Sequence, residues 1–341
     1  MQTFEPHPLL RNPHMQTLAS TYLPRRFPRL PRSVSREFEV EPGTRIRGEG
    51  HWQPAPQERP TLVLVHGLEG SSESGYMFGL AERAFVAGWN AVRLNQRNCG
   101  GTESLTPTLY NSGLSNDYRA VLMELIERDR LQEIFFAGYS MGGNLVLKMA
   151  GELAGAAPRE LRGVAGVCPT IELAKCADAI ALPGNFIYEY HFVTRLKKRM
   201  ERKARLFPGK FDLSPLARVR TVREFDEAIT AKYCGFRGAD DYYERSSALR
   251  VVSEIRVPAL IVTAQDDPFV PFAIFSDPAL AHNPRIRLIA PEHGGHCAFI
   301  SRYAGEARFW AEASLMEFCS GHSLPHQGST FTDKSVPRLT R

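Results

Sequence analysis

The sequence lacks the features that define several classes of protein. No apolar stretch approaches the roughly 18 residues needed to cross a bilayer. The first residues carry neither a basic start nor an apolar core, so we expect no secretory signal. The six cysteines show no CxxC spacing and no dense framework, which is typical of free thiols in a reducing compartment. These absences predict a cytoplasmic protein.

The net positive charge is concentrated in one segment. The formal net charge is +5, and residues 195–205 alone carry seven Lys or Arg against the single acid Glu201. The rest of the chain is therefore close to neutral. No zinc-finger, RNP or helix-turn-helix signature accompanies the basic segment, so we expect no nucleic-acid partner.

Apolar runs of strand length alternate with helical periodicity along most of the chain. At 341 residues, the chain could hold one large domain with an insertion or two smaller domains. Two antiparallel strands are expected at residues 36–40 and 45–52. Further strands are expected at residues 61–65, 90–94, 133–137, 163–168, 259–264 and 286–289. Helices are expected at residues 76–86, 114–126, 142–153 and 305–318. This βαβ repetition predicts a mostly parallel, doubly wound sheet of the α/β class.

The alternation is interrupted once and does not reach either end of the chain. Residues 169–250 are helical in pattern, and we interpret them as a cap inserted into an α/β core formed by residues 36–168 and 251–320. Residues 1–35 show no periodicity and are expected to form an irregular arm. Residues 321–341 are polar and are expected to be a loose tail.

A single G-x-S-x-G pattern is the candidate nucleophile site. It reads Gly138-Tyr139-Ser140-Met141-Gly142, after an apolar strand and before a helical segment. In a nucleophile elbow the serine lies on a strained strand-to-helix turn, and residues two positions away must be small. The pattern alone is a weak signal, but its context predicts Ser140 as a nucleophile rather than part of a simple glycine-rich turn.

A serine hydroxyl needs a base, and the base needs an acid that holds its tautomer. Asp267 follows the strand expected at 259–264, and its spacing to Pro271 favours it over Asp266, which could instead cap the turn. His296 follows the next strand and two glycines, which favours it over His293. The sequence therefore predicts Ser140, Asp267 and His296 as a catalytic triad.

The backbone amides of Leu68 and Met141 are the candidate oxyanion donors. One follows the strand-ending pair His66-Gly67, and the other follows the nucleophile. This chemistry requires no cofactor. The grouping of His293, His296 and Cys297 suggests a metal site, but no further ligands stand at zinc-like spacing, so we expect none.

Several longer motifs resemble the YheT-like family of α/β-hydrolases. They are Asn12-Pro13-His14-Met15-Gln16-Thr17, His66-Gly67-Leu68-Glu69-Gly70, Arg97-Asn98-Cys99-Gly100-Gly101, Arg223-Glu224-Phe225-Asp226, Asp241-Tyr242-Tyr243 and His293-Gly294-Gly295-His296. The resemblance implies the α/β-hydrolase fold and hydrolysis of carboxylic esters, with acylglycerols, phospholipids or short-chain esters as substrates. It supports the same triad. Asn111 stands where the family pattern has histidine.

The predicted function is thus a serine hydrolase of carboxylic esters, of the carboxylesterase or lipase type. An amidase or thioesterase could use the same triad, and a non-catalytic binding protein could use the same fold. Residues 186–207 combine an apolar stripe with the basic segment. They are expected to pack the stripe on the body, with peripheral contact to an anionic membrane as the alternative. The sequence gives no prediction of oligomeric state.

Overall fold

The computed structural model describes residues 3–324. The loose tail expected at residues 321–341 therefore lies, from residue 325 onward, outside the described residues. No helix in the described part of the chain is both long and apolar enough to cross a membrane.

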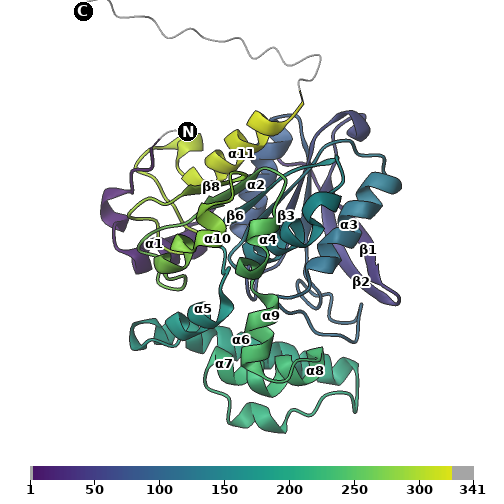
Figure 1. Ribbon diagram of the computed structural model, residues 1–341, viewed down its shortest axis with the longest axis vertical. Helices are drawn as coiled ribbons and strands as arrows, with labels where there is room; N and C mark the ends of the chain where they lie inside the picture. The colour runs from purple at the N-terminus through teal and green to yellow at the C-terminus, as the bar shows by residue number, and fades with distance from the viewer. Residues whose placement is uncertain (1–2, 325–341) are drawn as a thin grey trace, which may run out of the picture.

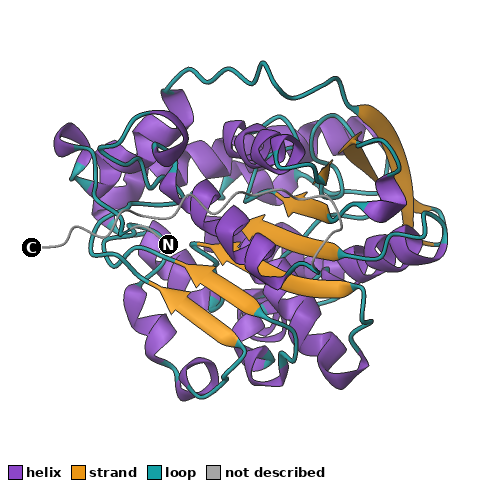
Figure 2. Cartoon of the chain, turned by 90° about the horizontal axis from the view of Figure 1, so that it is seen from above, coloured by secondary structure: helices purple, strands orange, loops and turns teal. Residues whose placement is uncertain are grey.

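An eight-stranded sheet forms the centre of the molecule (Figure 2). Its strands are β1 (Val34–Glu41), β2 (Thr44–His51), β3 (Thr61–Val65), β4 (Asn90–Leu94), β5 (Ile134–Tyr139), β6 (Leu161–Val167), β7 (Ala259–Val262) and β8 (Ile286–Ile289). The spatial order is β1-β2-β4-β3-β5-β6-β7-β8. The β1–β2 and β2–β4 pairs are antiparallel, and all other pairs are parallel. The predicted α/β fold class is confirmed.

Helices cover both faces of the sheet. They include α2 (Gly75–Val86), α3 (Ser115–Glu127), α4 (Met141–Leu153), the short α10 (Pro278–Ala281) and α11 (Trp310–His322). On β3, Val63 and Val65 pack with α3 and α4, whereas Leu62 and Leu64 pack with α2 and α11. Because successive side chains of a strand point to opposite faces, a continuous apolar run is buried on both sides.

Between β6 and β7 the chain forms helices only. They are α5 (Leu173–Ile180), α6 (Phe186–Leu206), α7 (Val222–Phe225), the π-helical turn Asp226–Ala231, α8 (Lys232–Cys234) and α9 (Ala239–Ser246). Figure 1 shows these helices gathered below the sheet. The Asn144 side chain of α4 attaches the segment to the body, because it donates to the carbonyl of Ser246 and accepts from the amide of Ala248.

The expectation that residues 1–35 are wholly irregular is wrong. They contain α1 (Pro13–Tyr22), whose N-cap Asn12 accepts hydrogen bonds from the amides of His14 and Met15. Apolar periodicity did not reveal this helix because it exposes Met15 and Leu18. Asparagine followed by proline is nevertheless a strong helix start, since proline suits the first helical position.

The interpretation of α6 as a helix that buries its apolar stripe and exposes its charges holds only in part. Val193, Leu196 and Met200 are buried. Two cations of the basic segment are buried as well, and they bind groups of the body. Arg199 pairs with Glu69 (2.9 Å), and the Lys203 ammonium donates to Asn98 and to backbone carbonyls of the loop at residues 103–106. The helical pattern did not indicate that Arg199 and Lys203 are buried.

Candidate active site

Ser140 occupies a strained turn between β5 and α4. Its φ is 53°, a left-handed conformation that costs free energy for a residue with a side chain. A Cβ at Gly138 would overlap the carbonyl of Gly142, and one at Gly142 would overlap the carbonyl of Val65. The glycines therefore permit the close approach that the motif predicted. The turn places Ser140 at the N-terminus of α4, where the helix dipole favours negative charge.

Two Asp–His pairs lie beyond the ends of β7 and β8. His296 Nδ1 donates to the Asp267 carboxylate, at 2.8 Å from Oδ2 and 3.1 Å from Oδ1. His293 Nδ1 lies 3.2 Å from Asp266 Oδ2. The Asp267 side chain is fully buried and that of His296 is 11% exposed, whereas that of His293 is 44% exposed. Only His296 lines the cavity that contains Ser140.

The acid is held by backbone amides as well as by the histidine. Asp267 Oδ1 accepts hydrogen bonds from the amides of Phe269 (2.8 Å) and Val270 (3.1 Å). Burial, the largest influence, disfavours a charged imidazole, but the Asp267 carboxylate and the neighbouring Cys168 outweigh burial and raise the pKa of His296 above its ordinary 6.5. The pair therefore favours uptake of a proton by His296.

Ser140 and His296 line the same cavity. Within residues 3–324 no hydrogen bond joins the Ser140 hydroxyl to His296. The Ser140 side chain instead lies against Gly67, where a Cβ would stand 3.7 Å from its Oγ. Catalytic hydrogen bonds are often long or poorly aligned before substrate binds. A productive arrangement thus requires adjustment of the serine or of the histidine loop.

The loop after β3 supplies a second amide to the same cavity. Leu68 and Met141 both line it, and neither amide donates a hydrogen bond to any other group in the described part of the chain. The loop is fixed by His66, which lies between Gly67 O (2.8 Å) and the amide of Gln96 (3.1 Å). Burial lowers the pKa of His66 to about 4, so its ring is neutral at physiological pH.

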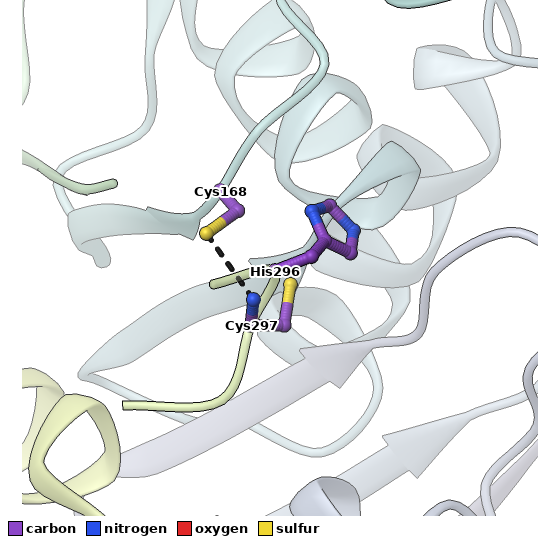
Figure 3. Close-up of side chains that lie close together, drawn as sticks. All are labelled: Cys168, His296 and Cys297. Atoms are coloured by element: carbon purple, nitrogen blue, oxygen red, sulfur yellow. Dashed lines mark hydrogen bonds between the residues drawn. The ribbon is translucent and has the colours of Figure 1, made fainter. Parts of the chain in front are cut away.

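Two cysteines lie close to His296, and sequence reasoning missed one of them, Cys168. Figure 3 shows the Cys168 sulfur beside the imidazole, with the amide of Cys297 donating to that sulfur (3.3 Å). The ligand atoms of Cys168, His296 and Cys297 lie within 4.8 Å of one another. His293, part of the grouping weighed in the sequence, turns instead to Asp266. Because His296 Nδ1 is already bound to Asp267, the absence of a metal ion stays our expectation.

The N-terminal arm supports the histidine loop. Thr17 Oγ1 accepts the amide hydrogen of His296 (2.9 Å), and Gln16 exchanges two hydrogen bonds with the backbone of Ile300. A Cβ at Gly295 would stand 2.6 Å from the carbonyl of Pro13. The signal for this role was the motif at residues 12–17, which sequence analysis singled out without assigning it a contact.

Asn111, the departure from the family pattern, lines the Ser140 cavity. Its Oδ1 accepts a hydrogen bond from the amide of Gly113 (2.8 Å), which shapes the loop before α3. The next residue, Ser112, accepts a hydrogen bond from the Asn144 side chain at its carbonyl. Asn111 thus has a structural contact at the wall of the site.

Comparison with known proteins agrees with this architecture. Residues 60–303 match the family described as alpha/beta hydrolase fold. The chain is 31% identical to "Putative esterase YheT" of Escherichia coli (strain K12) over 312 residues, which cover 90% of each chain. It is 28% identical to phospholipase ABHD3 of Mus musculus over 243 residues, covering 71% of this chain and 59% of the relative.

A solved structure shows the same fold at low identity. The Pyrococcus furiosus esterase Pf2001 matches with a TM-score of 0.58 and 15% identity, over 94% of this chain and 98% of that one. The sheet order, the turn at Ser140 and the family match point to the same conclusion. The chain belongs to the α/β-hydrolase family and, within it, to the YheT-like proteins.

Proposed function

We propose that this hydrolase cleaves carboxylic esters through an acyl-enzyme on Ser140, with His296 as base and Asp267 as the acid that orients it. The observation that carries the proposal is the buried Asp267–His296 hydrogen bond, which faces the same cavity as a serine held on a strained strand-to-helix turn. The relatives named as esterase and phospholipase support ester hydrolysis.

The first half of the reaction forms the acyl-enzyme. Ser140 Oγ attacks the carbonyl carbon while His296 takes the hydroxyl proton. The carbonyl oxygen becomes an anion, which in this proposal accepts hydrogen bonds from the amides of Leu68 and Met141, two residues that line the cavity. The intermediate collapses as its bond to the alkoxy oxygen breaks, and His296 gives its proton to the leaving alcohol.

The second half releases the acid. Water attacks the acyl carbon, and His296 takes a proton from the water. The bond to Ser140 Oγ then breaks, and His296 returns the proton to the serine. Asp267 stays ionised and stabilises the imidazolium in both halves.

The cavity offers an apolar site for the acyl chain. It extends from Ser140 between the body and the helices of residues 173–243. Its apolar lining includes Leu173, Ile180, Phe192, Leu196, Met200, Val222 and Phe225. The aromatic residues of the helical segment that line the cavity are Phe192, Phe225, Tyr242 and Tyr243.

Hydrolysis of p-nitrophenyl esters of graded acyl length, beside a monoacylglycerol, tests the proposal. We expect turnover that depends on chain length and is lost in Ser140→Ala. Normal turnover in Ser140→Ala would refute the nucleophile. Faster cleavage of the matched thioester or anilide would favour the thioesterase or amidase alternative, and no turnover of any of them would favour a binding protein.

A cytoplasmic location and independence from cofactors remain part of this proposal. Support for the location comes from the cysteines, all six of which are free thiols. Activity that is unchanged after treatment with EDTA is the expected result for a triad that needs no metal.

A further inference from the structure

A second cavity adjoins the cavity that contains Ser140. Asn98 and Arg199 line both of them. The walls of the second cavity are α6, the residues 69–71 that follow the oxyanion residue Leu68, and the loop at residues 98–103. Glu69, which lines the second cavity, directly follows the proposed oxyanion residue Leu68 in the chain.

Four cations of α6 face this cavity. Arg195, Lys198, Arg199 and Arg202 line it, and their spacing of three and four residues places them on one face of the helix. Like charges at this spacing destabilise a helix. A concentration of cations on one face thus requires compensation by negative charge.

The protein supplies only part of that compensation. Glu69 pairs with Arg199 (2.9 Å) and Glu103 pairs with Arg202 (2.9 Å). Arg195 donates to the carbonyl of Glu69 (2.9 Å) but lies 3.9 Å from its carboxylate. Lys198 has no hydrogen bond or ion pair within residues 3–324. Four cations against two carboxylates leave a net positive cavity.

Backbone donors complete the lining. The amides of Gly100 and Gly101 donate no hydrogen bond to another group of the described chain, and a Cβ at Gly101 would meet nothing within 4 Å. Several cations beside free amide donors are the arrangement that binds phosphate oxygens, because each oxygen accepts charge-assisted hydrogen bonds.

We propose that this cavity is a phosphate subsite, which binds a phosphate carried on the alcohol part of the ester substrate. The inference rests on the proposed function. The acyl chain takes the apolar cavity among the cap helices, so the charged cavity beside Leu68 receives the leaving alcohol. The substrate class is then a carboxylic ester of a phosphorylated alcohol.

Two esters that differ only in phosphate test the subsite. We would compare hexanoylglycerol with hexanoylglycerol 3-phosphate, both kept below the concentration at which they aggregate, so that no lipid surface takes part. We expect kcat/KM to be about tenfold higher for the phosphate ester, the ratio expected from one charge-assisted contact. Lys198→Gln should reduce this ratio severalfold.

Arg205→Gln is the matched control, because Arg205 lies on the same helix, is exposed and does not line the cavity. It should leave the ratio unchanged. Equal kcat/KM for the two esters, or a ratio that Lys198→Gln leaves intact, would overturn the subsite.

Absence of turnover with both esters would count against the proposed function and leave the subsite to a binding measurement. Calorimetric titration with glycerol 3-phosphate should then show binding that Lys198→Gln weakens. Binding that is the same in the variant would overturn the subsite. Tighter binding of inorganic phosphate than of glycerol 3-phosphate would assign the cavity to the free ion and overturn its role in substrate binding.

Discussion

Replacing Asp267 by asparagine should abolish most activity without changing the shape of the site. Asp267 Oδ1 accepts two backbone amides, so the amide oxygen of asparagine takes that place. Its NH2 group then stands 2.8 Å from His296 Nδ1, where Oδ2 stood. Two donors cannot face each other, so the ring proton moves to Nε2, the nitrogen that must accept the Ser140 proton.

The expected loss is about 10⁴-fold in kcat, or about 5.5 kcal/mol in the barrier. The assay is steady-state hydrolysis of a p-nitrophenyl ester, with circular dichroism to confirm folding. Asp266→Asn is the matched control, because Asp266 pairs with the half-exposed His293 instead. It should lose less than about tenfold, since one acceptor is retained for the amide of Gly295. A severe loss in Asp266→Asn beside an active Asp267→Asn would refute the assignment.

Three further predictions follow from geometry and charge. Gly142→Ala should lower the free energy of unfolding by about 3 kcal/mol or more, because its Cβ overlaps a carbonyl of β3; urea unfolding measures this, and Gly155→Ala, with open space around its Cβ, should be neutral. Catalysis needs a neutral His296, and the pKa of His296 is raised, so kcat/KM should fall with decreasing pH along a limb that lies above pH 6.5. In Asp267→Asn this limb should shift to lower pH. A limb that does not shift would contradict the pairing of Asp267 with His296. Membrane contact by residues 186–207, the alternative drawn from the sequence, stays a prediction. Phe186 and Ile187 are 66% and 62% exposed, so binding to anionic vesicles should weaken with added salt and with serine at both positions. Equal binding to neutral vesicles would remove the idea.

The central strands β3 and β4 could be predicted closely because every residue of each strand is buried. The runs at 61–65, 90–94 and 286–289 match β3, β4 and β8 in both bounds. A short apolar run that ends at polar or glycine residues leaves little freedom in its assignment. Ser140, Asp267 and His296 each come after a strand, so the same alternation of strands and helices also located these three candidates along the chain.

What sequence did not reveal depends on contacts between distant segments. The helix α1 exposes its apolar residues, so periodicity missed it and only its cap, Asn12 followed by Pro13, indicates a helix start. Cys168, which follows β6, lies beside His296 because the loop after β8 reaches past β7 to the end of β6. The burial of Arg199 requires Glu69, which lies 130 residues earlier in the chain. Such partners cannot be read from local periodicity.

The choice between neighbouring candidates shows the same limit. Asp266 and Asp267 have the same side chain one residue apart, and periodicity cannot separate them. The structure does so through geometry, because successive residues at the end of β7 point in different directions and reach different histidines. In the sequence, the spacing between Asp267 and Pro271 favoured Asp267. In the structure, the hydrogen bond between Asp267 and His296 is the observation that separates the two aspartates.

The most direct test is the site of covalent labelling by a fluorophosphonate probe, located by peptide mass spectrometry. The probe's phosphorus bonds to a serine oxygen only where a base removes the hydroxyl proton. The account predicts a single adduct on Ser140 that is absent in Ser140→Ala and forms far more slowly in His296→Gln. An adduct on another residue, or undiminished labelling of the Ser140→Ala protein, would contradict it.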